Sequence, residues 1–132
     1  MFEELKEYLK NSYSPYSNFK VSSCLVTKNN KKYFGVNVEN ASYGASICAE
    51  RVAITKALSE GEKKEDFKEI HILGSTSNTM PCFICRQTFA EFFDENVKIY
   101  IYDTEGNYEK YSMNELCPYP FSLGDKLWEV VL

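Results

Sequence analysis

The sequence feature that most constrains the fold is a pair of cysteine motifs, each at the expected start of a helix. The first is CAER at residues 48–51, where Ala49, Val52, Ala53 and Ala57 lie at helical spacing and Gly61 follows as a stop. The second is PCFIC at residues 81–85, which opens a pattern with Phe89, Phe92 and Phe93 on one face. Three thiols and a carboxylate at two helix starts indicate a functional site.

A C-x-x-C pair at a helix start is compatible with a redox dithiol or with half of a metal site. A redox dithiol needs neither a third cysteine nor a neighbouring acid. Cys48, Cys82 and Cys85 instead fit a catalytic zinc with three protein ligands and one open position. Glu50 lies two residues after Cys48, where helix side chains do not face each other, so it fits a proton shuttle better than a ligand.

Three thiolates around a divalent ion leave a net negative charge, which opposes activation of a water molecule. Two features are expected to offset this charge. Both ligand groups lie at helix N-termini, where the backbone dipoles stabilise anions. Arg51 lies three residues after Cys48, close enough on a helix to donate to the ligand sulfur. The alternative for Arg51 is a surface arginine paired with a carboxylate.

These motifs match the three-cysteine signature of zinc-dependent nucleobase deaminases. The likeness extends to SPYSNF at residues 14–19 and NVENASY at residues 37–43. Over most of its length the sequence resembles the small homotetrameric cytidine deaminases. The resemblance implies one zinc per chain, a homotetramer, and hydrolytic deamination of cytidine, and of deoxycytidine, to uridine or deoxyuridine and ammonia. Glu50 would move protons between the attacking water, ring N3 and the leaving ammonia.

The resemblance also implies a set of substrate contacts. Asn37 and Glu39 share one face of an expected strand and can hold sugar hydroxyls, although a solvated strand end is the alternative. By the resemblance, Tyr43 reaches across a subunit boundary. The alternative for Phe19 is an inward-facing strand residue, and for Phe121 an aromatic plug on its own core. The predicted substrate-binding residues are Phe19, Asn37, Glu39, Tyr43, Ala49 and Phe121.

Length and charge limit the class of protein. The 132 residues are expected to form a single domain, residues 1–132. The net charge is −4 and no run of basic residues occurs, which disfavours a nucleic-acid partner. Neither a signal peptide nor a membrane span is expected. Free cysteines favour the reducing cytoplasm.

Periodicity predicts a helix over residues 2–11 and strands over residues 19–27, 32–39, 69–74, 97–102 and 108–111, with a short helix over 112–116. The last two strands are joined by too few residues for a parallel crossover, so they must be antiparallel. The expected fold is a three-layer α/β/α domain around a mixed sheet of about five strands. His71, inside a buried strand, is expected to be a packed core residue.

Some residues depart from the deaminase pattern. Phe83 and Ile84 replace small residues between the second and third cysteines and are expected to reshape the rim of the pocket. One rival function is deamination of a modified nucleoside such as blasticidin S. A second is a structural zinc module that uses Cys24 or Cys117 as a fourth ligand, although this reading gives Glu50 no role.

Overall fold

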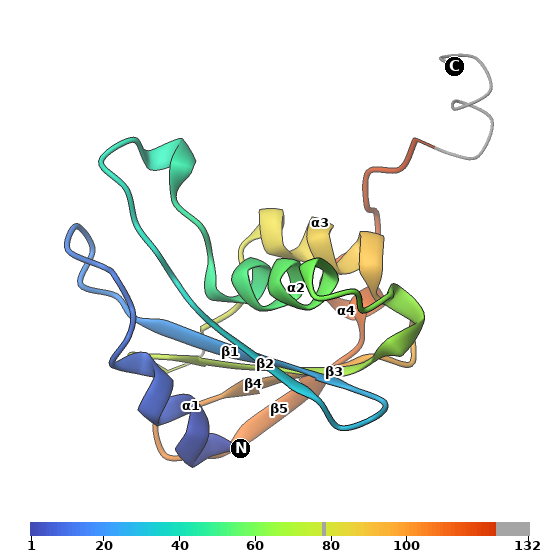
Figure 1. Cartoon of the computed structure of the whole chain (residues 1–132), viewed down its shortest axis with the longest axis horizontal. Coiled ribbons are helices and arrows are strands. Elements are labelled where there is room, and N and C mark those ends of the chain that lie inside the picture. Colours follow the sequence, from blue (N-terminus) through green and yellow to red (C-terminus); the bar gives the residue numbers. More distant parts are fainter. Residues whose placement is uncertain (78, 124–132) are drawn as a thin grey trace.

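The computed structural model describes residues 1–77 and 79–123. Five strands form one sheet in the order β2-β1-β3-β4-β5, with helices on both faces (Figure 1). The elements are α1 (Phe2–Leu9), β1 (Val21–Thr27), β2 (Lys32–Val36), η1 (Tyr43–Ala45), α2 (Ala49–Ser59), η2 (Lys64–Asp66), β3 (Phe67–Gly74), α3 (Phe83–Phe92), β4 (Lys98–Tyr102), β5 (Tyr108–Tyr111) and α4 (Met113–Leu116).

The sheet is mixed. Strand β1 pairs antiparallel with both β2 and β3, β3 pairs parallel with β4, and β4 pairs antiparallel with β5. The crossover from β3 to the parallel β4 passes through α3, as a parallel connection requires. The predicted mixed five-stranded sheet with an antiparallel final pair is confirmed.

Helices α2 and α3 cover one face of the sheet and α1 covers the other (Figure 1). Strand β1 shows why, because its side chains alternate between two cores. Leu25 belongs to the cluster under α2 and α3, whereas Cys24 belongs to the cluster under α1. All seven β1 residues are therefore buried. Among the described residues, no helix is long and apolar enough to cross a membrane.

Small residues bring α2 close to the sheet. A Cβ placed on Gly35 of β2 would lie 2.5 Å from the Ala49 carbonyl oxygen and 2.6 Å from the Ala53 amide nitrogen, so only glycine fits. The predicted apolar stripe of α2 was partly wrong, since Val52 is half-buried while Ile54 is fully buried. The helix ends at Ser59, just before the predicted stop at glycine 61.

The second strand is shorter than predicted. It ends at Val36, and the chain then leaves the sheet. Val38 forms isolated bridges to Tyr13 and Ile47, which tie this segment to the loop before β1 and to the approach to α2. Asn37 and Glu39 therefore lie outside the regular ladder, where each side chain is free to turn toward a different neighbour.

Candidate active site and metal centre

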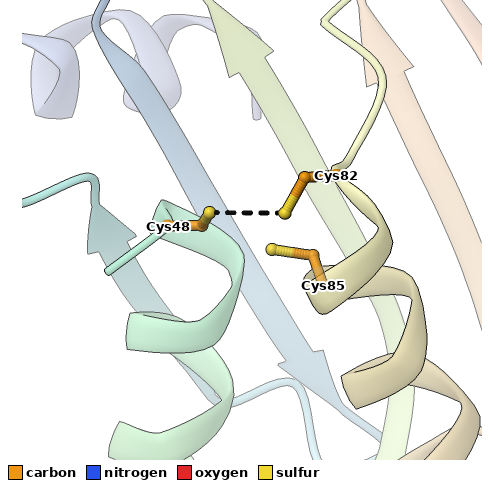
Figure 2. Close-up of side chains that lie close together, drawn as sticks. All are labelled: Cys48, Cys82 and Cys85. Atoms are coloured by element: carbon orange, nitrogen blue, oxygen red, sulfur yellow. Dashed lines mark hydrogen bonds between the residues drawn. The ribbon is translucent and has the colours of Figure 1, made fainter. Parts of the chain in front are cut away.

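Three cysteine side chains meet where the first turns of α2 and α3 approach each other. Cys48 immediately precedes α2, Cys82 immediately precedes α3, and Cys85 lies in the first turn of α3. Their Sγ atoms all lie within 4.8 Å of one another, and those of Cys48 and Cys82 are 3.6 Å apart (Figure 2). The structure thus brings together the three residues that were predicted as ligands.

This donor set fits zinc. Three sulfur ligands with one open position are typical of a catalytic site, whereas a structural site uses four protein ligands. Within residues 1–77 and 79–123, neither Cys24 nor Cys117 joins the cluster. Cys24 is buried in the core on the opposite face of the sheet. His71 is the β3 partner of Cys24, and its Nδ1 lies 2.9 Å from the Tyr102 hydroxyl on that same face, away from the cluster.

The thiols influence one another's protonation. A hydrogen bond from the Cys85 thiol is the main cause that lowers the pKa of Cys48 to about 5, and further hydrogen bonds from Cys82 and Arg51 act in the same direction. The same contact with Cys48, together with burial, raises the pKa of Cys85. The shared contact therefore favours the thiolate of Cys48 over that of Cys85. Because zinc binds thiolates, metal binding must release the remaining thiol protons.

Arg51 lies beside the cluster. Its Nη2 is 4.0 Å from the Cys48 Sγ and 3.4 Å from the Ser46 carbonyl oxygen. Its Nε is buried and has no hydrogen-bond partner among the described residues. The guanidinium thus contributes positive charge next to a sulfur, which is where the sequence placed it. Its role in tuning the metal stays a prediction.

Glu50 is the buried acid of the site. Only 3% of its surface is exposed, since it lies in the first turn of α2 against the sheet. Burial is the main cause that raises its pKa to about 7, and the negative charge of Cys48 also raises it. A carboxyl group with such a pKa both accepts and donates protons near neutral pH, as a general acid–base catalyst must.

A cavity of about 190 Å³ lies directly in front of these groups. Of the predicted site residues, it is lined by Phe19, Asn37, Cys48, Ala49, Glu50 and Cys82. A carboxyl group, two cysteines and an aromatic ring therefore line one cavity. Such a cavity can take a flat polar ring with its reactive carbon close to the thiols and the acid.

Three cavity residues were missed by sequence reasoning: Val21, Thr79 and Met80. Val21 could have been predicted from the sequence, because it lies two residues after Phe19 in an alternating segment. Met80 lies next to the second cysteine motif, which was a usable signal. Thr79 has no signal of its own. Its position depends on Gly74, where a Cβ would lie 1.8 Å from the Thr79 Oγ1.

Asn37 is held by three hydrogen bonds. Its Oδ1 accepts from the Ser12 hydroxyl at 2.5 Å and from the Val21 amide at 2.9 Å, and its Nδ2 donates to the Phe19 carbonyl at 2.7 Å. Both acceptor sites of the amide are thus used by the fold, and one N–H remains. The side chain is fixed at the wall of the cavity beside Phe19.

Glu39 lies in a neighbouring space rather than in the same cavity. Together with Tyr43 it lines a cavity of about 320 Å³, whose other lining residues are Tyr16, Ser17, Asn40 and Ser46. Its Oε1 accepts from the amides of Tyr16 and Ser17 at 2.9 and 3.1 Å, and its Oε2 accepts from the Ser17 hydroxyl. The structure therefore places Asn37 and Glu39 at two separate cavities.

Phe121 is not a plug on its own core, because 72% of its surface is exposed. Its backbone is fixed by Gln87, whose side-chain amide donates to the Phe121 carbonyl and accepts from the Phe121 amide, both at 2.9 Å. Phe83 and Ile84 are also exposed, and neither lines the cavity. The expectation that these two side chains reshape its rim is therefore wrong for a single chain.

Comparison with known proteins supports the reading of this site. Residues 1–101 match the family model described as the cytidine and deoxycytidylate deaminase zinc-binding region. The chain is 35% identical over 116 residues to the cytidine deaminase of Mycoplasma genitalium, which covers 88% of each protein. It is 36% identical over 126 residues to that of Halalkalibacterium halodurans, covering 95% of this chain and 94% of the relative.

The fold has solved counterparts. The crystal structure of cytidine deaminase from Burkholderia pseudomallei superposes with a TM-score of 0.86 at 38% identity, covering 91% of this chain and 95% of that one. That of the Mycobacterium leprae enzyme gives 0.74 at 30% identity, covering 90% and 95%. The motifs, the three-thiol cluster and these matches agree, and the chain belongs to the zinc-binding cytidine and deoxycytidylate deaminase family.

Proposed function

We propose that this protein hydrolyses the exocyclic amino group of cytidine and of deoxycytidine, giving uridine or deoxyuridine and ammonia. One observation carries the proposal: the buried Glu50 and the thiols of Cys48 and Cys82 line the same cavity. A structural zinc module has no need of a buried acid beside an open ligand position. Hydrolytic deamination needs both.

The residues of the chain divide the chemistry between them. Cys48, Cys82 and Cys85 would hold one zinc ion, which when bound supplies the Lewis acidity that makes a water molecule nucleophilic near neutral pH. Glu50 takes a proton from the attacking water and delivers it to ring N3. The water oxygen bonds to C4, Glu50 carries the proton of the new C4 hydroxyl to the amino group, and the C4–N bond breaks to release ammonia and leave a C4 carbonyl. The Glu50 carboxyl group is buried and lines the cavity beside the thiols, which places it to carry both protons.

The remaining hydrogen-bonding capacity of two side chains supports recognition of the sugar. Within the described residues, Asn37 retains one N–H donor, and Glu39 retains one acceptor site on Oε2. Each group can bind a sugar hydroxyl, because the amide donates a hydrogen bond and the carboxylate accepts one. We propose that ribose and deoxyribose are both accepted, because deoxyribose keeps the 3′- and 5′-hydroxyls.

We propose a homo-oligomer, a tetramer, in which neighbouring subunits complete each site. Tyr43 and Phe121 are 79% and 72% exposed and stay outside the catalytic cavity of their own chain, which suits contacts to a second copy. We further propose that residues 1–132 act as a single domain, without a nucleic-acid or membrane partner. The reduced three-thiol cluster favours the cytoplasm.

The test is turnover of cytidine by the zinc-loaded protein, followed by loss of near-ultraviolet absorbance. Glu50→Gln removes the titrating group and preserves shape, so we expect it to retain zinc and lose turnover. Ser59→Ala, at the exposed end of α2, is a control for the effect of mutagenesis. Full activity in Glu50→Gln would refute the role of Glu50. Conversion of blasticidin S but not of cytidine would keep the reaction and replace the substrate.

A further inference from the structure

The loop before β1 carries the hydroxyl of Ser17, which lies between two predicted substrate-binding residues, Glu39 and Phe19. Ser17 donates its hydroxyl proton to Glu39 Oε2, and the Ser17 amide donates to Glu39 Oε1 at 3.1 Å. The same Ser17 Oγ accepts from the Phe19 amide at 3.0 Å. One side chain thus joins the carboxylate of the larger cavity to the backbone of a residue that lines the catalytic cavity.

A second hydrogen bond holds the other backbone group of Phe19. The Phe19 carbonyl accepts from Asn37 Nδ2 at 2.7 Å, so the side chains of Ser17 and Asn37 hold both backbone groups of Phe19. Asn18, between Ser17 and Phe19, has a φ of 56°, and its amide donates to the Ser14 carbonyl at 2.9 Å. The loop therefore takes a left-handed turn that points Ser17 Oγ back toward the Phe19 amide.

Charge and geometry favour a positioning role for this hydroxyl. The carboxylate accepts three hydrogen bonds from two adjacent residues, Tyr16 and Ser17, and the serine hydroxyl is the one side-chain donor among the three. Hydrogen bonds to an ionised carboxylate are stronger than neutral ones. The Ser17 hydroxyl lowers the pKa of Glu39, as a hydrogen bond donated to the ionised carboxylate does. Without the hydroxyl, Oε2 has no described partner to fix its direction.

We propose that Ser17 is a positioning residue that orients Glu39 toward a hydroxyl of the sugar and keeps it in register with Phe19. This inference rests on the proposed function, since it assigns Glu39 to the substrate. It predicts that Ser17 acts on substrate binding through the sugar hydroxyl, and not on the chemical step at the base.

The experiment compares two substrates. Ser17→Ala should raise KM for cytidine about tenfold, the loss of one charge-assisted hydrogen bond, and change kcat less than about twofold. For 2′,3′-dideoxycytidine, which offers no ring hydroxyl to Glu39, the same substitution should leave kcat/KM nearly unchanged. Ser59→Ala, at the exposed end of α2, is the matched control and should behave as the wild type with both substrates.

Rescue and coupling sharpen the test. Ser17→Thr keeps the hydroxyl and should restore KM. Ser17→Val has the shape of threonine without the hydroxyl and should not restore it. This pair also keeps the test valid if the alanine variant fails to fold. Adding Ser17→Ala to Glu39→Gln should cost little more than Glu39→Gln alone. An unchanged KM, or equal losses with both substrates, would overturn the positioning role while leaving deamination in place. Absence of turnover in the wild type would instead refute the proposed function.

Discussion

Gly35 offers a direct test of how the sheet positions the catalytic helix. An added Cβ would lie 2.5 Å from the Ala49 carbonyl oxygen, and ordinary contact begins at 3.4 Å. The helix or the strand must therefore move by about 0.9 Å, the difference between 3.4 and 2.5 Å. The two nearest of the three α2 atoms around this Cβ belong to the backbone, which cannot rotate away. Cys48 and Glu50 flank Ala49, so the displacement falls on the site itself.

Two magnitudes follow from this displacement. Overpacking of a core typically costs about 1–3 kcal/mol, and one kcal/mol shifts the melting temperature of a domain of this size by roughly 4 °C. We therefore expect Gly35→Ala to melt about 4–12 °C below the wild type. A misplacement of about 1 Å can reduce a rate on the order of a hundredfold, so kcat/KM should fall by up to about that factor.

The assay pairs thermal unfolding with cytidine turnover and zinc content at saturating metal. Gly44→Ala is the matched control, because its Cβ would have no neighbour within 4 Å and its φ lies outside the left-handed range. We expect this control to melt and react as the wild type. A Gly35→Ala protein with unchanged melting temperature and unchanged kcat/KM would refute the reasoning, since β2 and α2 would then separate without consequence.

Three further outcomes are expected. Ser23→Ala should raise the free energy of unfolding by about 1 kcal/mol in urea titrations, because the Ser23 hydroxyl is buried with no hydrogen-bond partner among the described residues; lower stability would contradict this. Arg51→Ala should lose zinc to a chelator about tenfold faster, because it removes a donor to the Cys48 sulfur, and Arg51→Lys should fall between; wild-type release from Arg51→Ala would contradict its role. In chelator-treated protein, burial raises the pKa of Glu50 from 4.5 to about 7. Between pH 4.5 and pH 7, the folded state therefore keeps a proton on Glu50 that the unfolded state has lost. The contribution of Glu50 to stability therefore falls as pH rises through this window, and Glu50→Gln should gain stability relative to the wild type between pH 5 and pH 8, on the order of 3 kcal/mol. If the difference in free energy of unfolding between Glu50→Gln and the wild type is the same at pH 5 and at pH 8, the argument from the buried carboxyl group is wrong.

The metal centre could be predicted from sequence because its parts are local. A cysteine before a helix, an acid two residues later and a C-x-x-C pair are short patterns, and the helix N-termini fix where their side chains point. The sheet was equally accessible, since alternation and a short final connection determine strands and direction. Only two long-range facts were needed beyond these patterns: that α2 and α3 share one face, and that their N-termini meet.

The substrate walls could not be predicted in the same way. Asn37 and Glu39 were placed together by assuming that the strand continues to residue 39, yet β2 ends at Val36. Beyond that point the direction of each side chain depends on partners far away in sequence. Ser12 and Ser17 lie 25 and 22 residues from the side chains that they bind. Neither has a local pattern that signals such a contact, so spacing along the chain carries no information about it.

Phe83 and Ile84 replace small residues of the deaminase pattern, and the effect of such a replacement depends on whether the side chain is buried or exposed. Bulk between two metal ligands suggested a narrowed pocket, but these side chains are 75% and 63% exposed, and the Phe83 ring packs under the guanidinium of Arg86 at 4.6 Å. Neither side chain lines the cavity, so their bulk does not narrow it. Their bulk instead enlarges the apolar surface of α3, where Gln87 also fixes Phe121. If neighbouring subunits complete the site, two parts of the chain select the substrate. One is the cavity lined by residues of α2, and the other is the exposed apolar surface of α3.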